Sequence, residues 1–225
     1  MPKYTPAAFC DGAVLARQNP AYLAHAGSFL GLALDQSESM NTLAGVAIDS
    51  VNYLIEEQRS LNGNSRFSLL LFNNSVETIR DAVPLSEFPL LDESRYRPCG
   101  GTALNDAVAG LIKSIGVHAQ GRRSSVLCVI VTDGMENASR YPHIEDIRQM
   151  VTYRRLTHGW QFLFLGPESA LDYALSIGIP RSNFAGFKTT SEGLRQILDR
   201  LGRAVKAYTL GSENHAHCGL PLRLC

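Results

Sequence analysis

Oxygen-bearing side chains stand where two apolar runs of the sequence end. Asp35, Ser37 and Ser39 alternate directly after the first run, so a curled loop can turn their three oxygens towards one point. Asp133 directly follows a second apolar run and Thr132. Ligands of open α/β sheets sit outside the carboxyl ends of the strands, so both places are suited to binding. The chemistry that these residue types offer is coordination of a cation by oxygen ligands.

Two short motifs extend this set. Gly100-Gly101-Thr102 precedes a helical stretch, and its glycines give the Thr102 hydroxyl a flexible approach to the same edge. Gly134 permits a tight turn directly after Asp133, where a side chain would obstruct. The alternative interpretation is that the two aspartates are only helix caps and turn formers, because Asp favours both roles. We expect instead a metal site made of five residues: Asp35, Ser37, Ser39, Thr102 and Asp133.

The elements that must position these residues alternate between strands and helices. The predicted strands are Phe29–Leu34, Arg66–Phe72, Val76–Val83, Ser125–Thr132, Gln161–Leu165 and Asn183–Phe187, with a tight hairpin turn at Asn73-Asn74. The predicted helices are 41–58, Ala103–Val117, Ile144–Leu156, Glu168–Ser176 and Ser191–Tyr208. The Pro- and Gly-rich stretch 84–101 is predicted to be an irregular connection. We therefore expect an α/β fold, a doubly wound Rossmann-like three-layer α/β/α sandwich with about six strands, five parallel and one antiparallel.

This pattern indicates one domain with an extension at each end. We assign residues 28–210 to the domain, 1–27 to an N-terminal extension and 211–225 to a C-terminal tail. In the tail, His215, His217 and Cys218 are soft ligands that could hold Zn²⁺. A flexible tail is the favoured interpretation, because no second cluster of such ligands accompanies them.

The bulk composition makes several classes of protein improbable. With 225 residues, 45% of them hydrophobic, the chain can bury one sizeable core. Lys plus Arg equals Asp plus Glu at 21 each, so no net charge favours nucleic acid or an anionic membrane. No apolar run approaches the roughly 20 residues of a membrane span, and residues 1–8 lack a signal-peptide core. Five cysteines without paired spacing suit a reducing compartment, so we expect a soluble cytoplasmic protein.

Taken together, the motifs resemble those of von Willebrand factor A (vWA) and integrin I domains. Asp-x-Ser-x-Ser after the first strand, Thr after glycines and Thr-Asp-Gly after a later strand are similar to the metal-ion-dependent adhesion site (MIDAS) of that family. The resemblance covers about residues 28–208, and the phrases Val131–Asn137 and Gly159–Gly166 resemble stand-alone bacterial and phage members. It implies that Ser37, Ser39 and Thr102 contact the metal directly, while Asp35 and Asp133 act mainly through bound water.

The implied cofactor is Mg²⁺, with Mn²⁺ or Ca²⁺ as alternatives. Mg²⁺ prefers oxygen ligands at about 2.0–2.1 Å and keeps several waters. Neutral hydroxyls leave much of its charge uncompensated, so the expected partner is a protein that offers an Asp or Glu carboxylate. Glu38 stands where relatives often carry Gly and could weaken that attraction. Glu136 and Asn137 either rim the metal face or are exposed loop residues, and the second interpretation is favoured.

We therefore expect a metal-dependent protein-binding module and no enzymatic activity. The sequence has no Gly-x-Gly-x-x-Gly after a strand, no P-loop and no Gly-x-Ser-x-Gly elbow. No His stands near Ser37 or Ser39 in the sequence to act as a base. Two alternatives stay open: a Mg²⁺-dependent phosphoesterase, which usually needs carboxylates in direct contact with the metal, and a structural assembly component whose site is unused.

Overall fold

The computed structural model describes residues 28–60, 65–119 and 124–214, and strands alternate with helices along them. The strands are β1 Ser28–Asp35, β2 Arg66–Phe72, β3 Val76–Pro84, β4 Ser125–Val131, β5 Gln161–Gly166 and β6 Phe184–Gly186. The α-helices are α2 Ala44–Arg59, α3 Leu104–His118, α4 Ile144–His158, α5 Leu171–Ser176 and α6 Ser191–Asn214. The predicted extension 1–27 and the cluster of His215, His217 and Cys218 lie outside the described residues.

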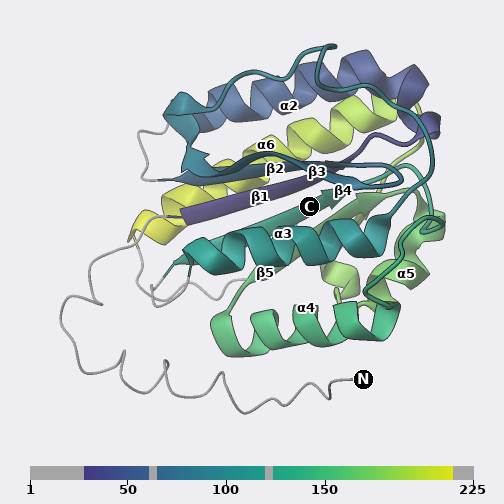
Figure 1. The fold of residues 1–225 in the computed structure, drawn as a ribbon. Coiled ribbons are helices and arrows are strands. Elements are labelled where there is room, and N and C mark those ends of the chain that lie inside the picture. The colour runs from purple at the N-terminus through teal and green to yellow at the C-terminus, as the bar shows by residue number, and fades with distance from the viewer. Residues whose placement is uncertain (1–27, 61–64, 120–123, 215–225) are drawn as a thin grey trace.

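A six-stranded sheet with the order β3-β2-β1-β4-β5-β6 forms the middle layer. The central strand β1 pairs in parallel with β2 and β4, while β3 pairs antiparallel with β2. Helices α2 and α6 cover one face of the sheet, and α3 and α4 cover the other (Figure 1). The expected α/β/α sandwich with one antiparallel strand is confirmed for the described residues. None of the helices in that part of the chain has the length and apolar character needed to cross a membrane.

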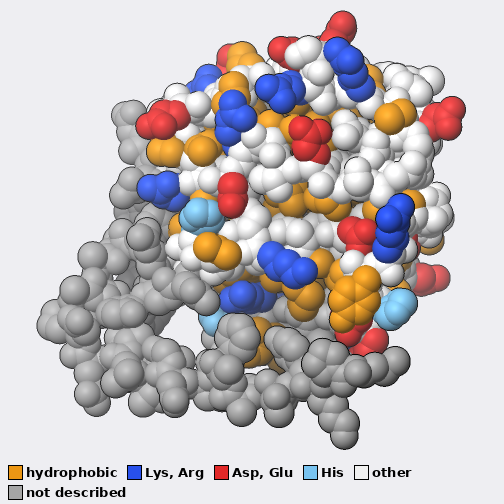
Figure 2. Space-filling model, in the orientation of Figure 1, with side chains coloured by type: hydrophobic (Ala, Val, Ile, Leu, Met, Phe, Trp, Pro, Cys, Tyr) orange, Lys and Arg blue, Asp and Glu red, His pale blue; other side chains and the backbone are white. Residues whose placement is uncertain are grey.

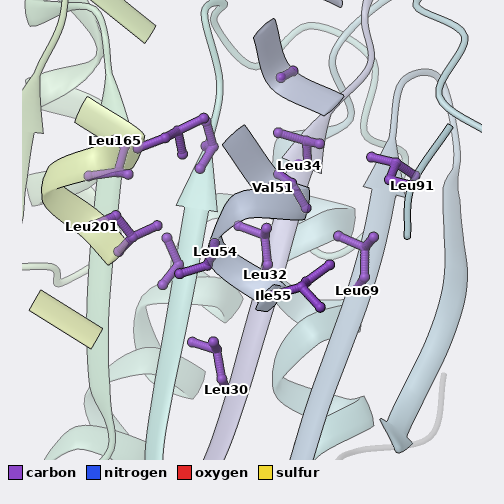
Figure 3. Packing of buried hydrophobic residues seen from close by; sticks show 14 of the residues in the cluster. Leu30, Leu32, Leu34, Val51, Leu54, Ile55, Leu69, Leu91, Leu165 and Leu201 are labelled. Atoms are coloured by element: carbon purple, nitrogen blue, oxygen red, sulfur yellow. The ribbon is translucent and has the colours of Figure 1, made fainter. Parts of the chain in front are cut away.

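Each face of the sheet has its own hydrophobic core, because alternate residues of a strand point to opposite faces. Leu30, Leu32 and Leu34 of β1 pack into the core beneath α2 and α6 (Figure 3). Phe29 and Ala33 of the same strand pack into the core beneath α3 and α4. Strand β1 is buried on both faces, which explains why it is a continuous apolar run.

Gly31 lets α3 lie close against the middle of β1. A Cβ atom at this position would lie 2.3 Å from Ile115 Cδ1 and 2.8 Å from Leu111 Cδ1, both on α3. Side chains do not pack at such distances, so any larger residue would push the helix away from the sheet. Because Thr102 closely precedes α3, this close packing also sets how near Thr102 lies to the end of β1.

The connection 84–101 is irregular, as predicted, apart from one short 3₁₀ turn at Leu85–Glu87. It is also an integral part of the core. Phe88, Leu91 and Tyr96 are buried in the cluster beneath α2, and the rings of Phe67 and Phe88 lie 4.7 Å apart edge to face. The segment therefore covers the apolar surface that β2 would otherwise expose.

The bounds of several elements differ from the predicted ones. A 3₁₀ helix at Glu38–Leu43 precedes α2, so the regular helix begins at Ala44 and not at residue 41 or 42. A further 3₁₀ turn at Glu168–Ala170 precedes α5. Helix α6 runs to Asn214, past the predicted end at Tyr208 and into the first residues assigned to the tail. Gly211 lies within this extension. A single glycine costs a helix only about 1 kcal/mol, which is too little to end a helix that packs through a long apolar stripe.

Candidate metal site

The sheet brings the two aspartates of the predicted site to neighbouring strand ends. Leu34 of β1 is in register with Val131 of β4, and both strands run in the same direction. Asp35 therefore ends β1 beside the residues that follow β4, namely Thr132 and Asp133. This juxtaposition follows from the parallel pairing of strands that are far apart in the sequence, and the hydrogen bond from Ser39 to Asp133 spans 94 positions.

Asp35 is fully buried and both of its carboxylate oxygens accept hydrogen bonds. Oδ1 accepts the backbone N–H of Ser37 at 2.7 Å, and Oδ2 accepts the Thr132 hydroxyl at 2.5 Å. The Asp35 carbonyl also accepts the hydroxyl of buried Tyr96 at 2.5 Å. Asp35 is thus held rigidly at the base of the cluster.

The two serines and Asp133 form a chain of polar contacts above Asp35. The hydroxyl oxygens of Ser37 and Ser39 lie 3.1 Å apart, and the Ser39 hydroxyl donates to Asp133 Oδ1 at 2.6 Å. Ser37 is buried, whereas Ser39 is exposed and Asp133 is half-buried. One end of the cluster is therefore enclosed and the other opens to solvent.

Gly134, in the loop after β4, marks the point where oxygens from two other loops converge. A Cβ atom at Gly134 would lie 3.2 Å from Thr102 Oγ1 and 3.9 Å from both Asp35 Oδ2 and Ser39 Oγ. Glycine leaves this small space to the surrounding oxygens. The structure thus brings together all five residues that the sequence predicts for the site.

Burial controls the electrostatics of the cluster. Desolvation raises the pKa of Asp35 to about 6, although the hydrogen bonds from Thr132 and Ser37 oppose the shift. The nearby charge of Asp133 adds to it. Desolvation also raises the pKa of Asp133, against the lowering effect of the Ser39 hydroxyl. Two carboxylates in a partly dry site destabilise each other when ionised, and a bound cation would relieve this.

The donor set fits a hard cation such as Mg²⁺. It consists of three hydroxyls and two carboxylates, and such oxygen ligands suit Mg²⁺ better than soft metals. No group of three His, Cys, Asp or Glu that could hold a metal occurs within the described ranges. A metal held here would therefore need the serine and threonine hydroxyls as well as the two aspartates.

Asn137 holds the Thr102 loop, a role that the sequence does not reveal. Its side-chain Oδ1 accepts the Thr102 N–H at 2.8 Å, and its backbone N–H donates to the Thr102 carbonyl at 3.1 Å. Asn74 Oδ1 accepts the neighbouring Gly101 N–H at 2.7 Å. Since these partners are far apart in the sequence, no local pattern could have indicated them.

Glu136 is turned towards α3 and acts as a cap. Its Oε2 accepts the Asn105 N–H at 2.8 Å in the first turn of α3 and the Ser139 hydroxyl at 2.7 Å. A carboxylate at a helix N-terminus satisfies free N–H groups and complements the helix dipole. Asn137 is an exposed loop residue, as the favoured interpretation expects, and Glu136 is partly exposed; in addition, both residues fix the loop that carries Thr102.

The rim of the site carries one acidic and one apolar side chain. Glu38 is exposed, and its backbone N–H donates to the Gly100 carbonyl at 3.0 Å, which joins the serine loop to the Thr102 loop. Met135 is 46% exposed directly beside Gly134. Both exposed side chains belong to the loops that carry the cluster.

The fold of the described residues is that of von Willebrand factor A domains. The vWF domain of the type V pili tip protein Mfa5 from Porphyromonas gingivalis has a TM-score of 0.66 at 10% identity, over 82% of this chain and 97% of that domain. The ArnB paralog VWA2 from Sulfolobus acidocaldarius has a TM-score of 0.55 at 18% identity, over 78% of this chain and 45% of that one.

A third similar structure is proximal thread matrix protein 1 from the mussel byssus with a zinc-occupied MIDAS motif. Its TM-score is 0.58 at 17% identity, over 78% of this chain and 47% of that one. The present chain thus spans about half the length of the byssus and Sulfolobus proteins. No protein-family model and no curated protein matches the sequence. At these identities the likeness establishes the fold alone.

Proposed function

We propose that this chain is a divalent-metal-dependent protein-binding module that captures an acidic residue of its partner at a MIDAS. The observation that carries the proposal is the convergence of Thr102, Asp35 and Ser39 oxygens around Gly134. These oxygens come from separate loops at the carboxyl edge of β1 and β4, where open α/β sheets bind their ligands. Such a convergence of hydroxyls and carboxylates has little structural purpose without a cation.

The five residues would have different roles in metal binding. Ser37, Ser39 and Thr102 would hold the ion directly, because their hydroxyls line the cluster. Asp35 would act behind them, since both of its carboxylate oxygens already accept hydrogen bonds from the protein. Asp133 would orient Ser39, to which it is bonded at 2.6 Å. Bound there, Mg²⁺ supplies a positive charge with a coordination position for a partner's Asp or Glu carboxylate.

The solved structures support a binding role over a catalytic one. They belong to a pilus tip protein and a byssal thread matrix protein, and the latter holds zinc in its MIDAS. We propose Mg²⁺ for this chain, with Mn²⁺ or Ca²⁺ as alternatives, because hydroxyl and carboxylate oxygens are hard ligands. Turnover of a phosphoester substrate that Thr102→Ala abolishes would contradict the binding role.

A cytoplasmic location is part of the proposal. Within the described ranges Cys99 is exposed and Cys128 is buried, and both are free thiols. An exposed free thiol suits a reducing compartment. Fractionation of the native host cell, with detection of the chain by antibody, tests this location.

Metal titration tests the proposed function directly. We expect Mg²⁺ to bind in calorimetry and to raise the melting temperature, with a stabilisation of about 2.7 kcal/mol when free Mg²⁺ is about 100 times Kd. Thr102→Ala should remove both effects. Thr78→Ala makes the same chemical change at an exposed position of β3, and it should leave both effects intact. Absence of heat and of thermal stabilisation with both Mg²⁺ and Mn²⁺ in the unmodified protein would favour a structural component with an unused site.

A further inference from the structure

A groove of about 370 Å³ lies beside the Thr102 loop, on the face of the molecule that α3 covers. One wall is the turn between β2 and β3, from Asn74 to Val76. The floor is the outer side of α3 from Asp106 to Lys113, and the other wall is the segment from Arg140 to Pro142. Figure 2 shows this face, on which basic, acidic and hydrophobic side chains lie close together.

The groove and the candidate metal site share their supporting residues. Asn74 lines the groove and at the same time accepts the Gly101 N–H at 2.7 Å. The groove wall at Arg140 closely follows the loop in which Asn137 holds Thr102. The groove therefore lies next to the loop that carries Thr102.

Two cations without ion pairs line this groove. Lys113 and Arg140 are both exposed, and neither forms an ion pair with another described residue. The one acidic side chain of the lining is Asp106. Its Oδ2 accepts the Arg140 N–H at 3.4 Å, and its buried Oδ1 has no hydrogen-bond partner in the described part of the chain. The groove thus offers two exposed positive charges, while this acidic oxygen at its base is closed to solvent.

The lining also offers apolar contact. Tyr141 is 70% exposed at the groove edge, and half-buried Val76 contributes aliphatic surface. An extended peptide matches this mixture, since it has side chains for apolar contact and carboxylates for the two cations. A nucleic acid matches it less well, because nucleic-acid binding rests on many phosphate contacts and the chain has a formal net charge of +0.

We propose that the groove binds the partner segment next to the metal-bound carboxylate, and that this segment carries a second Asp or Glu for Lys113 and Arg140. Binding of the first carboxylate rests on the proposed function. The groove adds a preference for acidic residues next to that carboxylate in the partner. The preferred partner is therefore a protein loop with clustered acidic residues. A single acidic residue in a neutral loop is a weaker ligand.

Two dye-labelled peptides of equal length test this proposal by fluorescence anisotropy with the full chain. One is Gly-Gly-Glu-Gly-Gly and the other is Glu-Glu-Glu-Glu-Glu. In Mg²⁺ we expect the all-Glu peptide to bind about tenfold more tightly, because exposed ion pairs contribute up to about 1 kcal/mol each. The paired charge reversal Lys113→Glu with Arg140→Glu should remove this gain and leave the affinity of the single-Glu peptide within about twofold.

Lys188→Glu with Arg195→Glu is the matched control. It makes the same change of net charge at two exposed positions outside the groove, in the segment from β6 to α6. In EDTA and low salt the all-Glu peptide should retain weak binding that only the groove variant loses. The groove proposal is overturned if both double variants lower the all-Glu affinity equally, or if a single-stranded oligonucleotide binds the groove more tightly than that peptide. The proposed function fails separately if neither peptide binds more tightly in Mg²⁺ than in EDTA.

Discussion

The carboxyl group of Asp35 combines full burial with two accepted hydrogen bonds and a nearby second carboxylate. Its folded-state pKa of about 6 lies above the ordinary value of 3.8. Such an upward shift means that the ionised form disfavours folding. Without metal, this destabilisation is fully present above about pH 6 and is relieved as the pH falls from about 6 towards 4, where the group is protonated in the folded state. Ionised Asp35 therefore destabilises the metal-free folded state at neutral pH.

Asp35→Asn removes this charge and keeps the shape of the side chain. The amide that replaces the carboxylate can accept from the Ser37 N–H and donate to the Thr132 oxygen, so the hydrogen-bonded base of the cluster is preserved. In EDTA at about pH 8, we expect Asp35→Asn to be more stable than the unmodified protein, by an amount on the order of 3 kcal/mol. At about pH 4 the two should differ little. Urea unfolding at these two pH values and at about pH 6 measures this difference.

The comparison isolates one group, because Asp133 is present in both proteins. The variant should also lose the stabilisation by Mg²⁺, since the charge behind the hydroxyls is gone. Parallel curves of stability against pH for the two proteins would show that Asp35 ionises in the folded state as it does in the unfolded chain.

At the scale of elements, the position of α3 against β1 sets the geometry of the Thr102 loop. This position depends on Gly31, where an added Cβ would meet Ile115 Cδ1 at 2.3 Å. Both the start of α3 and the loop before it are then held by Glu136 and Asn137 from the loop after β4. The position of Thr102 is thus fixed by the packing of α3 against β1 and by the hydrogen bonds from the loop after β4.

Gly31→Ala tests this packing. We expect it to destabilise the fold by about 1–3 kcal/mol, because Ile115 and Leu111 must move in a filled core. Gly45→Ala is the control, since nothing lies within 4 Å of a Cβ at that helical position. It should be neutral or stabilise the fold by up to about 1 kcal/mol. Chemical denaturation of both variants gives the two free energies, and equal stability of Gly31→Ala and the unmodified protein would contradict a tight contact.

At the scale of the whole molecule, one sheet separates two cores that must unfold together. The core beneath α2 and α6 and the core beneath α3 and α4 both depend on β1 and β4. Trp160 is the one tryptophan of the chain, and it is buried in the second core with the Arg154 guanidinium 4.7 Å from its ring centre. Its fluorescence therefore reports on one face of the sheet alone.

Trp160 fluorescence and far-UV circular dichroism should show the same melting temperature. The physical reason is that neither core can persist once the shared strands separate. Mg²⁺ should shift both signals by the same amount, because metal binding stabilises the single folded state. Two separate transitions would show that the layers unfold independently.

The amino-acid sequence determined much of this fold by itself. Strands buried on both faces require continuous apolar runs, so β1, β2 and β4 could be located to within about a residue at each end. The five candidate residues could be named because they follow these strands and a glycine pair, and the structure brings them together. Their role in metal binding stays a proposal.

Tertiary structure alone decided how the Thr102 loop and the connection after β3 are held. Asn137 pairs with Thr102 across 35 positions, and Glu136 caps the helix that begins at Leu104, far earlier in the chain. The connection residues Phe88 and Tyr96 are buried by elements distant in the sequence. Polar contacts of this kind depend on which loops the sheet order places side by side. The sequence has no periodic signal for them, because periodicity reports only which face of an element is buried.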